Sequence, residues 1–357
     1  MADKNQNSTY TLGVIIPCWN CEDHIHSTIE CLINQSFADW EAFLVDDQST
    51  DSPADIIKAY ATKDGRINYV RRNRNPKGAQ VCRNTGFDLT EGAKYVVFFD
   101  SDDVIAPYCF EQRVAFMQQH PSCDFAIFKA KTFSQSIFEQ EAAMYGIEFT
   151  DDLLSAMLNW SLPIVGWTNI YKRQSLVDYA ICWDEKILSL QDSDFNIQSL
   201  ISDMQYMFAK DCKVDYFYRK VENGISKKIR TKAHYESHLY LLNKTLTTVS
   251  QSTQANDVVL QNNILLFYNL IKQDKESVKK ILRLQWLRDR KINYLKMWLY
   301  ILWGGRGKKY LFPKERNFSC EMNQKWHQAI ERNIEEFIEY APKDNKLLKL
   351  RDLVSYK

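Results

Sequence analysis

Short apolar runs alternate with amphipathic segments over the first 130 residues, and this alternation restricts the possible folds more than any other feature. The apolar runs predict buried strands, and the amphipathic segments between them predict crossover helices. Such a chain builds an α/β domain around a doubly wound, mostly parallel sheet. We expect strands at residues 12–16, 42–45, 67–70, 95–99 and 125–128, and helices at 22–35, 53–62, 78–89 and 108–119.

The rest of the chain divides into a mixed part and a helical part. After residue 133 we expect helices at 151–159 and 190–202 and a strand at 214–218. The polar stretch 221–232 predicts a mobile loop, and the pattern after it is almost entirely helical. Because 357 residues exceed one ordinary core, we expect two domains, an α/β domain at 1–230 and a helical C-terminal domain at 231–357.

Composition excludes several classes of protein. Apolar residues make up 45% and charged residues 25%, as in soluble globular proteins, and a net charge of +1 argues against a nucleic-acid partner. The N-terminus shows no signal-peptide pattern, and no apolar run approaches the length of a membrane span. Nine cysteines without a framework spacing favour reduced thiols, so we expect a cytoplasmic protein.

Two acidic clusters follow predicted strands. Asp46 and Asp47 end one apolar run, and Asp100, Asp102 and Asp103 end another. Since parallel strands bring their carboxyl ends to one edge, these carboxylates would repel one another unless a ligand lay between them. Hard oxygen donors suit Mg²⁺ or Mn²⁺ together with substrate phosphates. The alternative is that single members, such as Asp51 or Asp103, only form turns or cap helices.

The stretch "VIIPCWNCEDHI" offers a rival interpretation. Cys18 and Cys21 stand between a strand and a helix, as in a thiol oxidoreductase, and a helix N-terminus lowers the pKa of a thiol. This reading does not explain the acidic clusters. A dehydrogenase is also disfavoured, because no Gly-x-Gly-x-x-Gly follows the first strand.

Four motifs, in this order, carry a resemblance to a known family: "VIIPCWN", "VDDQSTD", "GAQVCRNTGF" and "FFDSDD". Together they resemble the family 2 glycosyltransferases of bacterial polysaccharide pathways, which have the nucleotide-sugar-binding glycosyltransferase A fold. The resemblance covers about the first 105 residues. It implies that residues 1–230 form the catalytic domain.

The resemblance also implies roles for matching residues at the nucleotide site. Asp47 would bind the uracil edge of the donor, and Pro17 would shape the base pocket. Asn20 lies where the family places the nucleotide-cradling end of its first strand. Asp100 would face the ribose or the water shell of the metal, and Asp102 would ligate the metal.

Other matching positions leave two readings open. Arg83 and Asn84 would support the nucleotide or brace the sheet edge. Trp167 would line the donor or acceptor pocket, or it is a core residue. The family's flexible lid corresponds to residues 223–230, where a side chain would approach the diphosphate or stay solvated; the candidates are Ser226, Lys227 and Lys228.

Inverting transfer needs a base that takes the proton of the acceptor hydroxyl. In "ILSLQDSDFNIQSL" the pair Gln191-Asp192 resembles the family's Glu-Asp pair, which makes Asp192 the candidate base and Phe195 the anchor of its helix. Gln191 departs from the usual Glu, and Asp194 is only two residues away. The alternative is that both aspartates only favour a helix N-terminus.

These observations predict a metal-dependent, inverting glycosyltransferase of the hexosyltransferase class. The donor would be a nucleotide-diphosphate sugar, with a UDP-sugar preferred, the cofactor Mn²⁺ or Mg²⁺, and the acceptor a glycan or lipid-linked glycan. The alternative is a catalytically silent nucleotide-sugar-binding protein. The presence of Asp102 and Asp192 argues against a protein without catalytic activity, and Gln191 in place of Glu argues for one.

Two further features lie near the C-terminus. His234 and His238 share a helical face, without a third metal ligand of suitable spacing. Residues 275–309 hold eleven Lys or Arg against two acidic residues, interleaved with Trp and Leu. This segment would lie on an anionic membrane surface, giving a peripheral location at its inner face, or it would pack its apolar side on the catalytic domain.

Overall fold

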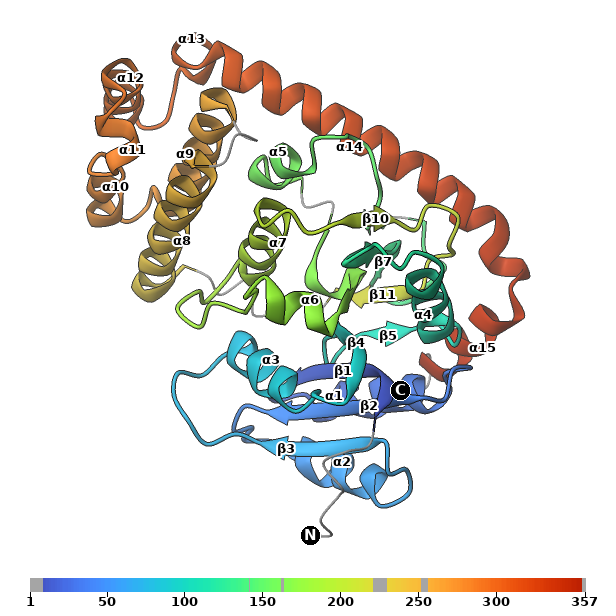
Figure 1. The fold of residues 1–357 in the computed structure, drawn as a ribbon. Coiled ribbons are helices and arrows are strands. Elements are labelled where there is room, and N and C mark those ends of the chain that lie inside the picture. The colour runs from blue at the N-terminus through green and yellow to red at the C-terminus, as the bar shows by residue number, and fades with distance from the viewer. Residues whose placement is uncertain (1–8, 141, 162–163, 221–229, 252–255, 355–357) are drawn as a thin grey trace.

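A seven-stranded sheet organises the first part of the computed structural model, which describes residues 9–140, 142–161, 164–220, 230–251 and 256–354 (Figure 1). Its strand order is β10-β6-β9-β4-β1-β2-β3. Only β9 runs antiparallel to its neighbours, so the expected mostly parallel sheet is confirmed. The strands are β1 (Tyr10–Cys18), β2 (Trp40–Asp46), β3 (Ile67–Arg71), β4 (Ala93–Phe98), β6 (Phe125–Ile127), β9 (Asn169–Lys172) and β10 (Tyr206–Phe208).

Helices cover both faces of this sheet. They are α1 (Glu22–Ile33), α2 (Pro53–Ala61), α3 (Ala79–Asp88), α4 (Cys109–Gln119), α5 (Leu153–Leu158), α6 (Arg173–Asp178) and α7 (Gln191–Ile201). Leu12, Val14 and Ile16 of β1 share a hydrophobic cluster with α1 and α4. Ile15 points the other way, toward α3, where a Cβ on Gly86 would lie 2.5 Å from its Cγ2 atom. The glycine of the "RNTGF" motif therefore lets helix and strand approach closely.

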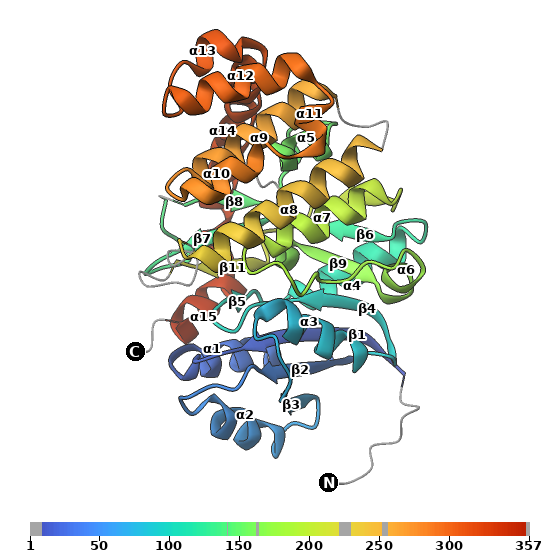
Figure 2. The same cartoon turned by 90° about the vertical axis from the view of Figure 1, so that its left-hand side faces the viewer.

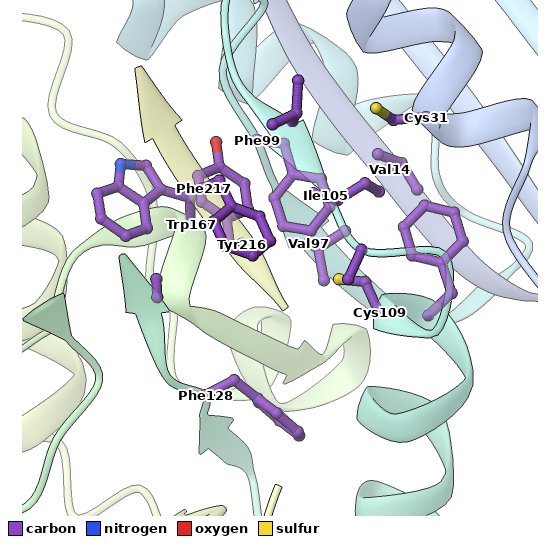
Figure 3. Packing of buried hydrophobic residues seen from close by; sticks show 14 of the residues in the cluster. Val14, Cys31, Val97, Phe99, Ile105, Cys109, Phe128, Trp167, Tyr216 and Phe217 are labelled. Atoms are coloured by element: carbon purple, nitrogen blue, oxygen red, sulfur yellow. The ribbon is translucent and has the colours of Figure 1, made fainter. Parts of the chain in front are cut away.

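A second, four-stranded sheet, of order β5-β11-β7-β8, lies beside the first. Only β11 matches an expected strand, since the sequence pattern gave no signal for its neighbours. Figure 3 shows the packing around it, with Trp167 and Tyr216 next to each other and Phe99 close by. The strands are β5 (Val104–Ile105), β7 (Ala130–Phe133), β8 (Met144–Tyr145) and β11 (Tyr216–Arg219).

From residue 230 onward every described element is helical, as expected. The elements are α8 (Lys232–Ser250), α9 (Asp257–Ile271), α10 (Lys275–Ile281), α11 (Gln285–Arg288), α12 (Lys291–Leu302), α13 (Lys308–Leu311), α14 (Pro313–Tyr340), the 3₁₀ turn η3 (Ala341–Lys343) and α15 (Asn345–Val354). Helices α12 and α13 lie at the end of the molecule opposite α2 and β3 (Figures 1 and 2). None of the described helices is long and apolar enough to cross a membrane.

The long helix α14 brings the chain back to the first sheet. It runs from α13 along one side of the molecule, and α15 contacts α1 (Figure 1). Trp326, Phe337 and Leu347 are buried in the same hydrophobic cluster as β1 and α1. A second cluster joins Phe98 and Phe195 to Leu242 and Leu265 of α8 and α9. Helices after residue 230 thus contribute to both cores, and the boundary between 230 and 231 stays a prediction.

Replacing Phe337 with Ala tests whether the C-terminal helices fold as a unit with the α/β part. Phe337 is buried, with its ring 6.0 Å from that of Phe217 on β11. Its truncation should cost about 3 kcal/mol of unfolding free energy. If the two parts unfold together, hydrogen exchange of the β11 amides should report the same loss of unfolding free energy.

The matched control is Glu335→Ala, an exposed position on the same helix, which should change the unfolding free energy by less than about 0.5 kcal/mol. Unchanged exchange at β11 in Phe337→Ala would instead indicate a helical domain that unfolds on its own.

Candidate active site

The carboxyl ends of β1, β2 and β4 meet at one edge of the sheet. The register places Cys18 beside Asp46, and Ile15 beside Phe98. The loops that follow these strands carry Asn20, Asp47 and Asp100. In open α/β sheets this edge is where ligands bind, because loops diverge there and backbone N–H groups become available.

Asp46 and Asp47 have different surroundings at the end of β2. Asp46 accepts hydrogen bonds from the Ser49 backbone N–H and the Tyr69 hydroxyl, both at 2.9 Å, and so shapes the following turn. Asp47 is buried, pairs with Arg72, and accepts the Gly78 backbone N–H at 2.7 Å. Asp47 therefore joins the end of β2 to the loop before α3.

The β1 loop is fixed by Asn20 and by the two cysteines. Asn20 Oδ1 accepts the Thr50 backbone N–H at 2.9 Å, which ties this loop to the one after β2, while Pro17 is buried in β1 beside Val45. A hydrogen bond with Cys21 and burial raise the pKa of Cys18 well above its usual value, and the same contact lowers the pKa of Cys21. Both thiols are buried, which argues against a reactive dithiol.

Arg83 connects the two halves of the site. Its Nη2 donates to Asp100 Oδ1 at 2.7 Å, and its Nη1 donates to Gln191 Oε1 at 3.2 Å. The guanidinium is buried and lies 4.5 Å from the centre of the Trp183 ring. Asn84, next to it, bonds both the N–H and the C=O of Trp183 and thus braces the same segment.

Gln191 is matched by another glutamine. Its Nε2 donates to Gln80 Oε1 at 2.8 Å while its Oε1 accepts from Arg83. An amide can do both, whereas an ionised Glu could only accept. The departure from the family's Glu is accommodated by this local partner.

Asp100 and Asp102 form the acidic pair after β4. Burial raises the pKa of Asp100, Asp192 adds to the rise, and Arg83 opposes it. Burial and Asp100 raise the pKa of Asp102 to about 6. Two partly buried carboxylates with raised pKa values are a donor set that a divalent cation would stabilise.

Asp103 has a structural position in the same loop. It is buried, and it accepts hydrogen bonds from the Tyr216 hydroxyl at 2.6 Å and the Arg219 backbone N–H at 2.7 Å. The Tyr216 hydroxyl also accepts the backbone N–H of Asp100 at 3.1 Å. The second sheet thus holds the acidic loop in place through β11.

Asp192 and Asp194, at the start of α7, face different partners. Asp192 is half-buried, and its Oδ1 accepts the Gly166 backbone N–H at 2.8 Å. The negative charge of Asp192 raises the pKa values of both Arg83 and Asp100, so the three side chains interact electrostatically. Asp194 is buried and pairs with Lys244 of α8 at 2.8 Å, so it serves to attach α7 to the helical region.

Trp167 lies in an aromatic stack behind the acidic loop. Its ring is 4.9 Å from that of Tyr216 and 5.4 Å from that of Tyr218, nearly parallel to both. With 6% of its surface exposed, it supports Tyr216 more than it lines an open pocket. Phe195, the expected anchor of α7, stacks on Trp183 at 4.3 Å and is buried.

The two late histidines have polar partners close to them in the structure: His234 shares a hydrogen bond with Thr231 at 2.8 Å. His238 is fully buried and shares a hydrogen bond with Ser189 at 2.7 Å, and burial lowers its pKa to about 4. Within the described parts of the chain, no three His, Cys, Asp or Glu side chains are grouped as metal ligands. Ser226, Lys227 and Lys228 of the expected lid lie outside the described residues.

The sequence analysis did not identify four residues that hold the site together: Arg72, Gln80, Gly166 and Tyr216. Gly166 offered a signal, since it immediately precedes Trp167, one of the matching positions. A Cβ there would lie 2.6 Å from Asp192 Oδ1 and 2.9 Å from the Trp183 ring. The other three act through partners that are distant in sequence, which a single sequence does not reveal.

Comparison with known proteins identifies the domain that carries this site. Residues 13–179 match the family model described as glycosyl transferase family 2. The putative teichuronic acid biosynthesis glycosyltransferase TuaG of Bacillus subtilis is 38% identical over 32% of this chain and 44% of its own. The poly(ribitol-phosphate) beta-N-acetylglucosaminyltransferase TarS of Staphylococcus aureus is 30% identical over 55% of this chain and 35% of its own.

Solved structures show the same fold. The crystal structure of S. aureus TarS 1–349 in complex with UDP-GlcNAc has a TM-score of 0.55 and 18% identity, covering 97% of this chain and 90% of that one. The chain spans less than half of the full TuaG and TarS sequences. The sequence match and the shared fold agree, and residues 13–179 carry a domain of glycosyltransferase family 2.

Proposed function

We propose that the protein is a metal-dependent, inverting glycosyltransferase that moves a sugar from a UDP-sugar to a glycan or lipid-linked glycan. The observation that carries this proposal is the link made by Arg83. It joins the acidic pair at the end of β4 to the start of α7, where Asp192 stands. One site therefore contains carboxylates for a metal and a separate carboxylate for a proton.

Asp47 supports a nucleotide base at the end of β2. Its two oxygens bond Arg72 and Gly78, and each carboxylate oxygen can accept a second hydrogen bond. The N–H of a uracil ring would be a suitable donor. TarS, with the same fold, was crystallised with UDP-GlcNAc, which supports a UDP-sugar here.

Asp102 and Asp100 would hold Mn²⁺ or Mg²⁺. Since no third protein ligand is grouped with them among the described residues, the diphosphate of the donor would complete the coordination. When bound, the metal would stabilise the negative charge of the departing diphosphate. Arg83 would keep Asp100 ionised and oriented by its 2.7 Å hydrogen bond.

Asp192 would act as the base. Its carboxylate takes the proton of the acceptor hydroxyl while that oxygen attacks the anomeric carbon from the face opposite the diphosphate. Gly166 N–H orients one carboxylate oxygen and leaves the other for the acceptor. Asp194 is unsuited to this role because Lys244 and Gln198 already bond its Oδ2.

Two other functions would each use part of these residues. A thiol oxidoreductase is disfavoured because Cys18 and Cys21 are buried. A silent nucleotide-sugar-binding protein would keep Asp47 and the acidic pair but would not transfer sugar. A screen of nucleotide sugars, with and without Mn²⁺, for thermal stabilisation and for turnover separates the three, and no response to any sugar would contradict our proposal.

The names of curated relatives support the proposed acceptor. Curated relatives are named for teichuronic acid biosynthesis and for poly(ribitol-phosphate) glycosylation, which supports a glycan acceptor. All nine cysteines are free, and six of them are buried, which supports a reducing compartment and therefore a cytoplasmic location.

Asp102→Asn tests the metal site. Removing one of two carboxylates should abolish the increase in UDP-sugar affinity that Mn²⁺ produces, as measured by calorimetry with and without a chelator. Asp23→Asn, at an exposed position of α1, is the control and should leave metal-dependent binding unchanged. Equal Mn²⁺ dependence in Asp102→Asn and the wild type would refute the assignment.

Asp192→Asn tests the base. General-base catalysis contributes roughly 100- to 10,000-fold, so kcat should fall by that factor while donor affinity stays within twofold. Asp194→Asn is the comparison: it should lower stability through the loss of the Lys244 pair but retain transfer. If Asp194→Asn lost transfer and Asp192→Asn did not, the assignment would be wrong.

Gly166→Ala tests the positioning of Asp192 without removing its carboxylate. The added methyl group would meet Asp192 Oδ1 and the Trp183 ring. A displacement of this kind should lower kcat by about 100-fold with little change in donor affinity. Gly65→Ala, where a Cβ would meet nothing within 4 Å, is the matched control and should retain full activity.

A further inference from the structure

Helix α12 is apolar on two opposite sides. Met297 and Tyr300 are buried against the helical region. On the other side Ile292, Leu295 and Leu302 are 73%, 56% and 59% exposed. Their spacing of three and seven residues places them along one line of the helix. We call the exposed row the apolar ridge; it comprises Ile292, Leu295, Trp298, Leu302 and Trp303.

This ridge is the main exposed apolar feature of the described chain. Among the described residues thirteen large apolar side chains are exposed, and seven of them lie between residues 292 and 310. A contiguous exposed apolar patch usually marks an interaction site. The alternative, in which this segment packs its apolar side on the protein, holds for the buried Leu284, Trp286, Leu287, Met297 and Tyr300. It does not account for the exposed ridge.

A cationic cavity adjoins the ridge. It has a volume of about 380 Å³ and is lined by Leu282, Arg283, Arg288, Lys291 and Tyr294, with no acidic side chain among its described lining residues. Lys291 begins α12 and precedes Ile292, the first residue of the ridge. A cavity lined by two arginines and a lysine suits a phosphate group.

The net charge around the ridge and the cavity is strongly positive. Residues 275–309 carry eleven basic and two acidic side chains, whereas the whole chain has a net charge of only +1. An anionic surface would therefore be attracted to this end of the molecule and repelled by the remainder. Figures 1 and 2 show α12 at the end opposite the N-terminal strands.

We propose that this end of the molecule binds an anionic phospholipid bilayer. The cavity takes the phosphate of a lipid headgroup, and the ridge enters the boundary between headgroups and acyl chains. Basic residues beside exposed Trp and Leu are the combination that holds a helix in that interface. Twelve residues of α12 make a helix too short to span the bilayer, so it lies along the surface.

A second copy of the chain is the competing occupant. Two copies meeting ridge to ridge would bring two strongly basic segments together, and the cavity would gain no anion. The bilayer satisfies the ridge and the cavity at the same time. This inference goes beyond the transfer reaction and does not depend on it.

Flotation of the full chain with vesicles tests the proposal. The wild type should bind vesicles of phosphatidylcholine with phosphatidylglycerol, less at high salt, and should not bind phosphatidylcholine alone. Since each basic residue near the surface contributes about 1 kcal/mol, Arg283→Gln/Arg288→Gln/Lys291→Gln should weaken binding roughly 100-fold. Leu295→Gln/Leu302→Gln should also weaken it.

Matched controls remove the same kinds of side chain elsewhere. Leu89→Gln/Met207→Gln removes two exposed apolar side chains. A second control replaces three exposed cations, Lys63, Lys94 and Lys325, with Gln. Both controls should bind vesicles as the wild type does. Thermal stabilisation by a UDP-sugar should be equal in all variants, which separates lipid binding from donor binding.

Three outcomes would overturn the proposal. One is no flotation with anionic vesicles at low salt, and another is an equal loss of binding in the control variants. The third is a dimer, detected by light scattering without lipid, that Leu295→Gln/Leu302→Gln abolishes while anionic vesicles fail to bind. That result would assign the ridge to a second copy of the chain.

Discussion

The buried guanidinium of Arg83 is the interaction on which the site depends. It lies between Asp100 at the end of β4 and Gln191 at the start of α7, with Trp183 against its face. These elements come from distant parts of the chain, and each would present an uncompensated polar group without the arginine. A buried charge is tolerated only when it is paired and hydrogen-bonded, so the arrangement also restricts how α7 docks on the sheet.

Much of the first half could be predicted, because its signals are local. Strand and helix boundaries between residues 10 and 128 agree with the expected ranges to within a few residues. Parallel strands buried on both faces produce short apolar runs, and the acidic residues that follow them are visible in the same motifs. The positions of Asp47, Asp100 and Asp102 at one edge follow directly from parallel pairing.

The remainder rests on contacts that no local pattern encodes. Strands β5, β7 and β8 have two to four residues each, too few for a clear period of two. Tyr216 reaches Asp103 and Asp100 across more than one hundred residues, and Gly166 reaches Asp192 from a 3₁₀ turn. The amphipathic pattern of α14 predicts a buried face, but not that Phe337 packs on β11.

The helical region is part of the site's framework as well as the carrier of the apolar ridge. Helix α8 bonds the loop before α7 twice, with Ser237 Oγ accepting the Leu188 N–H and His238 sharing a hydrogen bond with Ser189. Because burial lowers the pKa of His238 to about 4, its ring is uncharged at neutral pH and this contact persists there. Lys244 then pairs with Asp194, one turn into α7. The position of α7, and with it that of Asp192, is therefore set by residues on both sides of position 230.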